Sequence, residues 1–246
     1  MFNGRRKILF AVYFFSLGLI SAIVQMILLR ETLISFRGNE LFLTYFLIAW
    51  LILISLGSLL FNGRFINRQL GFFISGYYFI ISFFIISAFL AIRLLPSMLH
   101  FSGEVPNLFY SLIGLPVAIL PVTLFLGLGF TLGSRYFYNL TPTKNILNIN
   151  LAYLWETGGF FLGSFIFNFW LVNLITFKLI LFLIIYCLFI NLLLLIYYYQ
   201  QSARKVFWLV FNLLFIFIIS WHLGAAVIYE NKTAAWRIPR EKLVSF

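Results

Sequence analysis

The chain has 246 residues, of which 63% are hydrophobic and 9% are charged, and its formal net charge is +11. A soluble domain is about half apolar and about a quarter charged, so water is excluded as the main solvent of this surface. The 17 Lys and Arg residues are spread between apolar runs, as contact with lipid phosphates requires, and this spread argues against nucleic-acid binding. A single cysteine and the complete lack of Asp exclude a disulfide framework, a thiolate metal cluster and catalysis by an aspartate.

Apolar runs of about twenty residues, the length that crosses a hydrocarbon core about 30 Å thick, recur along the chain. They lack the period-two alternation of a membrane barrel, so the fold class is all-α. We expect one bundle of about seven transmembrane helices over residues 1–230, followed by a polar, basic tail at 231–246. The predicted helices are 8–29, 41–61, 70–92, 108–132, 149–171, 179–199 and 206–228.

The lysines and arginines between these runs set the expected orientation. With the N-terminus in the cytoplasm, the inner connections carry more of them than the outer connections, an excess that the basic tail reduces. The sequence therefore predicts a multi-pass protein of a bacterial inner membrane, with its N-terminus inside and its C-terminus outside.

Two prolines, Pro116 and Pro121, lie inside the fourth run. Each removes a backbone donor, which predicts a kinked helix. The carbonyl groups that lose this donor need partners from neighbouring helices or from water.

Glu156 lies about two turns into the fifth run. A carboxyl group inside a membrane span must be protonated, paired or hydrated, because a lone charge is costly there. The nearest cation by topology is Arg135, at the end of the preceding helix, so an ion pair across this hairpin is expected. Such a pair could serve helix packing alone, which is the simpler interpretation, or could belong to a proton, ion or ligand site.

The first predicted helix carries a polar stripe, because Gly18, Ser21 and Gln25 follow a spacing of three and four residues. Gln25 is expected to hydrogen-bond to another helix. Beyond this stripe, charged residues crowd the first outer loop, a composition typical of a tight turn held by charge pairs or of a docking surface. These charged residues are Arg30, Glu31, Arg37 and Glu40.

Two stripes of small residues predict close helix packing, because small side chains let backbones approach where lipid provides no hydrophobic drive. One stripe lies on the fourth helix and the other on the fifth, so these two helices are expected to pack together. The stripes are Gly129 with Gly133, and Gly159 with Gly163.

Three segments carry a family resemblance. The stretch QMILLRETLISFRGNEL (25–41), followed by Trp50, resembles the membrane half of bacterial fused spermidine synthase-like proteins. GLGFTLGSR (127–135) is similar to the end of that family's fourth helix. YLWETGGFFLG (153–163) is similar to the family's helix in which a Glu is followed by glycines. The likeness covers most of residues 15–175.

The resemblance implies a soluble aminopropyltransferase-like domain after the membrane half, with a Gly-rich cosubstrate loop and an Asp base. This chain has no Asp and no such loop, so we expect no catalysis and no cofactor or metal. The tail from Trp236 to Phe246 is similar to the lead-in strand of that domain.

The leading functional hypothesis is a scaffold or anchoring subunit that contacts membrane lipids and docks a protein partner. The first alternative is a carrier of an ion or a polyamine-like molecule that uses Glu156. The second is a subunit of a redox complex that uses His100 and His222, although nothing around these histidines enforces haem ligation.

Overall fold

The computed structural model describes residues 4–36, 38–60, 70–99, 108–139, 147–174 and 176–198, and all regular secondary structure in these ranges is helical. The predicted helix 206–228, the tail 231–246, Arg37 and both histidines lie outside these ranges. The helices are α1 (Gly4–Ser35), α2 (Glu40–Leu60), α3 (Leu70–Leu99), α4 (Leu108–Asn139), α5 (Leu147–Ile166), the π-helix η2 (Phe167–Leu171) and α6 (Thr176–Tyr198).

Four of the helices are long and apolar enough to cross a membrane, as the sequence predicted for its first four runs. Helices α1, α3 and α4 extend about a turn or more beyond their predicted ends, because polar residues at these ends continue the helix. The apolar segment of α6, Lys178–Leu194, is shorter. The four membrane-compatible segments are Lys7–Ser35, Glu40–Leu60, Gly76–Leu95 and Ser111–Tyr138.

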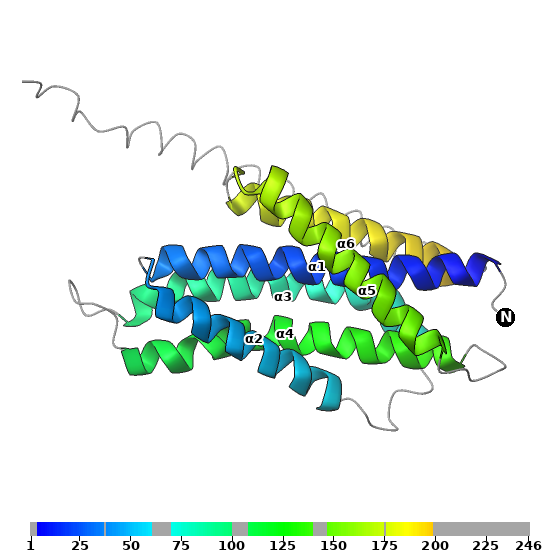
Figure 1. Ribbon diagram of the computed structural model, residues 1–246, viewed down its shortest axis with the longest axis horizontal. Coiled ribbons are helices and arrows are strands. Elements are labelled where there is room, and N and C mark those ends of the chain that lie inside the picture. The colour runs from blue at the N-terminus through cyan, green and yellow to red at the C-terminus, as the bar shows by residue number, and fades with distance from the viewer. Residues whose placement is uncertain are drawn as a thin grey trace, which may run out of the picture.

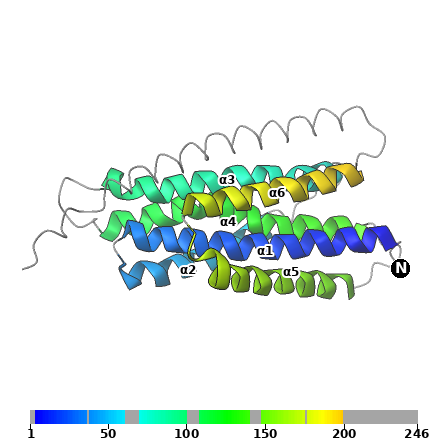
Figure 2. The same ribbon diagram turned by 90° about the horizontal axis from the view of Figure 1, so that it is seen from above.

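Helix α1 is the centre of the bundle and contacts each of the other five α-helices. Its most apolar window is 67% buried, against 28% for that of α2. Figure 2 shows α3 and α6 on one side of α1 and α4, with α2 and α5 on the other side. Helix α5 crosses α1 obliquely in Figure 1. This arrangement leaves α2 and α5 as the outer helices on the second side.

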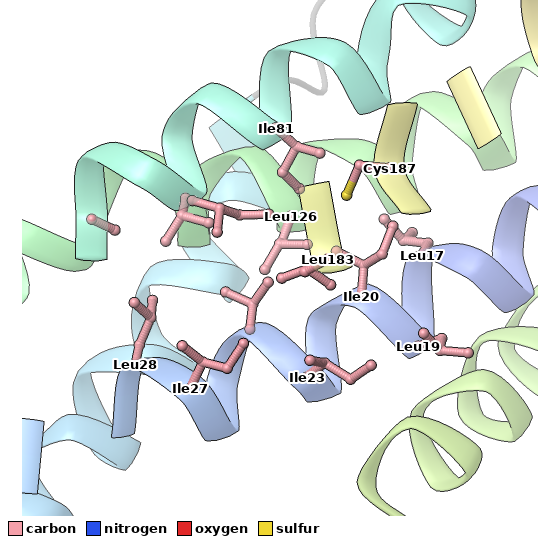
Figure 3. Close-up of a cluster of buried hydrophobic side chains, with 14 of the residues drawn as sticks. Leu17, Leu19, Ile20, Ile23, Ile27, Leu28, Ile81, Leu126, Leu183 and Cys187 are labelled. Atoms are coloured by element: carbon pink, nitrogen blue, oxygen red, sulfur yellow. The ribbon is translucent and has the colours of Figure 1, made fainter. Parts of the chain in front are cut away.

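Aliphatic side chains from α1, α3, α4 and α6 meet in the core between these helices (Figure 3). Leu17, Ile20, Ile81, Leu183 and the thiol of Cys187 are all buried there. In a lipid environment such packing holds helices together through dispersion contacts, since the lipid tails are as apolar as the core.

Three tyrosines with fully buried side chains join the helices through their hydroxyl groups. Tyr13 donates a hydrogen bond to the carbonyl of Gly129 at 2.9 Å, and Tyr77 donates to the carbonyl of Phe125 at 2.9 Å. Tyr78 donates to the carbonyl of Tyr13 at 2.6 Å. These bonds connect α1, α3 and α4, and they satisfy hydroxyl groups that would be costly to bury alone.

Helices α4 and α5 touch, but the tight packing expected between them is not found, since α5 packs mainly on α1. A Cβ atom added at Gly18 would collide with the backbone of Glu156, and one added at Gly159 would collide with the carbonyl of Phe15. A Cβ at Gly163 would come within 2.8 Å of the carbonyl of Leu19. The glycines of α5 therefore permit backbone contact with α1.

The glycines of α4 face other helices. A Cβ at Gly127 would collide with the carbonyl of Ile54 in α2. Those at Gly129 and Gly133 would collide with the rings of Tyr77 and Tyr13. The stripe on α4 thus makes room for two of the buried tyrosines, and a spacing of small residues alone does not say which element fills the space.

Helix α4 continues through both prolines as one element. Pro116 has no N–H to donate to the carbonyl of Leu112, four residues earlier. The hydroxyl of Tyr45 in α2 donates to this carbonyl at 2.6 Å. The expected replacement partner from a neighbouring helix is therefore confirmed for Pro116.

The charge pairs expected within the first loop involve Arg37, which lies outside the described residues, but Arg30 and Glu31 both have partners far from the loop in sequence. Arg30 donates to the carbonyls of Val172 and Leu174, at 2.9 and 3.0 Å, just beyond η2. Glu31 is buried and pairs with Arg93 of α3, with 3.8 Å between Oε1 and Nε. Arg30 is thus bonded to the turn that follows η2 and Glu31 to α3, and α1 continues through both residues.

The turn after α1 is held by its own backbone. Gly38 has a φ of +77°, a conformation that L side chains rarely adopt, and its N–H donates to the carbonyl of Leu33 at 2.7 Å. The side chain of Asn39 accepts a hydrogen bond from the N–H of Leu41 at 3.0 Å, as a helix N-cap does. Glu40 begins α2 and is exposed.

Candidate functional site

Glu156 lines a cavity of about 190 Å³ between four helices. Because the lining side chains Ser55 and Tyr153 are exposed, the cavity opens on the side of the bundle that α2 and α5 form. The lining residues are Leu17 and Ser21 of α1, Ile54, Ser55 and Ser58 of α2, Leu126, Gly127 and Phe130 of α4, and Tyr153 and Glu156 of α5.

Close backbone packing on two sides places this cavity. Gly18 lets α5 approach α1 at Glu156 itself, and Gly127 lets α4 approach α2 beside Ile54 and Ser58. The hydroxyl of Thr131 adds a hydrogen bond from α4 to the carbonyl of Ser58 at 3.1 Å. The walls of the cavity are therefore held by glycine contacts on both sides of the space they enclose.

The half-buried carboxyl group of Glu156 has neither an ion pair nor a hydrogen-bond partner within the described ranges. The expected pair with Arg135 is not formed there, and Arg135 has other interactions. A carboxylate removed from water gains no compensation from its own chain in this arrangement, so the group must be protonated, hydrated or paired with a bound cation.

Two serine hydroxyls of the cavity are oriented by their own helix. Ser55 donates to the carbonyl of Leu51 at 2.8 Å, and Ser58 donates to the carbonyl of Ser55 at 2.8 Å. Serines inside helices often make this bond to an earlier carbonyl. The cavity also has an apolar wall, which Leu17, Ile54 and Phe130 form.

The other polar residues singled out from the sequence do not share this site. Gln25 is half-buried one turn beyond Ser21 and does not line the cavity. Arg30, Glu31 and Glu40 lie further along the chain, around the turn between α1 and α2. Among the described residues, no group of three His, Cys, Asp or Glu side chains could hold a metal ion.

Sequence reasoning missed Ser55, Ser58 and Tyr153. The serines are three residues apart on α2, and Tyr153 is three residues before Glu156 on α5, so each pair shares a helix face. This spacing was a usable signal for polar faces. It gave no indication that the two faces meet.

In comparisons with protein-family models, curated proteins and solved structures, nothing matches this chain.

Proposed function

We propose that this chain is a multi-pass protein of a bacterial inner membrane that carries small cationic solutes through the cavity at Glu156. The observation that carries the proposal is the half-buried carboxyl group without a partner in a cavity between four helices. In a membrane protein, an ionisable group that faces a cavity is by default a candidate for an ion or substrate pathway.

The proposal includes the predicted topology. The four long apolar helices supply four spans. Helix α5 with η2, helix α6 and the segment 206–228 supply the other three, with the N-terminus inside and the C-terminus outside.

The size of the cavity limits the solute. Pockets for drug-sized ligands occupy about 300–1,000 Å³, and this one has about 190 Å³. It suits a hydrated ion or an organic cation of a few non-hydrogen atoms. The single carboxylate matches a single positive charge, so monovalent cations and short amines are the expected solutes.

Uptake into proteoliposomes tests the proposal. Vesicles that contain the purified chain are supplied with radiolabelled sodium or methylammonium, and uptake is compared with that of empty vesicles. Glu156→Gln keeps the shape of the side chain and removes its charge, so it should abolish uptake while the protein stays folded. The control Glu40→Gln removes an exposed charge at the start of α2 and should leave uptake unchanged. Normal uptake by Glu156→Gln would refute the proposal.

The scaffold hypothesis and the resemblance to the membrane half of spermidine synthase-like proteins stay predictions. Recovery of a stoichiometric protein partner from mild detergent would support the scaffold, and a purified monomer would count against it. The redox alternative depends on His100 and His222, and an absorption spectrum without a Soret band would remove it.

A further inference from the structure

The carbonyl bonds of Ser55 and Ser58 determine what their hydroxyl groups can offer to a ligand. A hydroxyl group has one proton and two lone pairs. Both protons are used, since Ser55 donates to Leu51 and Ser58 donates to Ser55. Toward a ligand in the cavity, each hydroxyl oxygen can therefore only accept a hydrogen bond.

Glu156 adds acceptors of the same kind. An ionised carboxylate has no proton to donate, and its oxygens have no hydrogen-bond partner among the described residues. The cavity thus presents three side chains that accept hydrogen bonds, one of them charged. A ligand that brings its own acceptors, such as a carboxylate or a phosphate, would meet repulsion from Glu156 and no donor from Ser55 or Ser58.

Ser21 and Tyr153 add two further hydroxyl groups to the lining, and the remaining side chains are apolar. Leu17, Ile54, Leu126 and Phe130 face the same space. The ring of Phe130 packs on the ring of Tyr153, with 4.5 Å between their centroids. A bare metal ion would leave this wall without contact, whereas a hydrocarbon stem would bury apolar surface against it.

We propose that the cavity binds a primary alkylammonium ion, with its N–H groups on the acceptors Glu156, Ser55 and Ser58 and its stem on the apolar wall. This inference rests on the proposed function, because it names the substrate class of the same site. The ammonium group has three donors and no acceptor, which is the complement of the acceptors that Glu156, Ser55 and Ser58 present.

Two probes separate this inference from simple attraction between opposite charges. n-Butylammonium has three N–H donors, whereas n-butyltrimethylammonium has the same charge and stem with none. Calorimetry on the full chain in detergent measures the affinity of each probe. A hydrogen bond to a charged group is worth about 1.5–3 kcal/mol, so loss of these donors should weaken binding about tenfold or more.

A serine variant excludes the size of the trimethyl group as the cause. Ser55→Ala with Ser58→Ala removes two acceptors and keeps both residues helical. It should weaken butylammonium about tenfold and leave butyltrimethylammonium unchanged. The matched control is Ser87→Ala on α3, whose hydroxyl makes the same kind of bond, to the carbonyl of Phe84 at 2.9 Å, outside the cavity. This control should bind both probes as the unaltered chain does.

The outcomes distinguish the two proposals. The alkylammonium inference would be overturned if the chain bound both probes with equal affinity. It would also be overturned if the serine variant lost affinity for both probes equally. If Glu156→Gln still lost binding in that case, the proposed cation carrier would stand. If Glu156→Gln bound the probes as well as the unaltered chain does, both proposals would fall.

Discussion

The hydrogen bond from Tyr45 to the carbonyl of Leu112 gives the sharpest test of how the bundle is held together. Tyr45→Phe removes the hydroxyl that donates to this carbonyl, and Pro116 has no N–H that could replace it. Ordinary hydrogen bonds between membrane helices contribute about 0.6 kcal/mol, with a maximum of about 1.7 kcal/mol. Because the usual helical donor to this carbonyl is missing at Pro116, the cost belongs at the upper end, and we expect a loss of about 1.5 kcal/mol.

The same substitution in a Pro116→Ala variant tests whether the missing N–H of Pro116 causes this loss of stability. In Pro116→Ala the new N–H can donate to Leu112, so Tyr45→Phe should then cost about 0.6 kcal/mol or less. The coupling between the two changes should be roughly 1 kcal/mol, which is well within the range that double-mutant cycles resolve. Tyr77→Phe is a matched control, because the carbonyl of Phe125 keeps its helical donor, the N–H of Gly129.

The free energies are measured by unfolding the purified variants with SDS in mixed micelles, followed by circular dichroism. An equal cost of Tyr45→Phe in both backgrounds would refute the reasoning, since the proline would then have no part in it.

Two further predictions concern contacts that hold α1. Gly159→Ala should destabilise the protein by about 1–3 kcal/mol, because the added methyl group meets the backbone of α1, whereas Gly158→Ala meets nothing within 4 Å and should be neutral or slightly stabilising in the same unfolding assay. Arg93→Gln should lower the temperature of thermal unfolding more than Glu31→Gln does. In the first variant the buried Glu31 loses this cation, whereas in the second the half-exposed Arg93 can be hydrated. The reverse order would contradict this assignment.

The helices could be predicted from the sequence because their signal is local. A run of about twenty apolar residues has few alternatives to a helix in lipid, whatever its neighbours are. The helix ends were less accurate for a non-local reason. Arg30 and Glu31 suggested a loop, yet α1 continues to Ser35, since these charges are compensated by the carbonyl of Val172 and by Arg93. Neither partner is near them in sequence.

In the candidate site too, the local features could be predicted from the sequence and the contacts between helices could not. Glu156 was found from the sequence because a carboxyl group in an apolar run is conspicuous. Its expected partner Arg135 was chosen by proximity along the chain, whereas the packing of α5 on α1 places Glu156 at a cavity with Ser21, Ser55 and Ser58. Glycine spacing predicts that a helix can be approached closely, but it carries no information on which helix approaches it.

The central claim is that the carboxyl group of Glu156 is available to a cation in this cavity, and chemical labelling tests it most directly. Dicyclohexylcarbodiimide partitions into lipid and reacts with carboxyl groups there, and peptide mass spectrometry identifies the modified residue. We expect Glu156 to be labelled, and n-butylammonium, but not the neutral n-butanol, to protect it. Labelling of Glu156 that is the same with and without the ammonium ion would contradict the account.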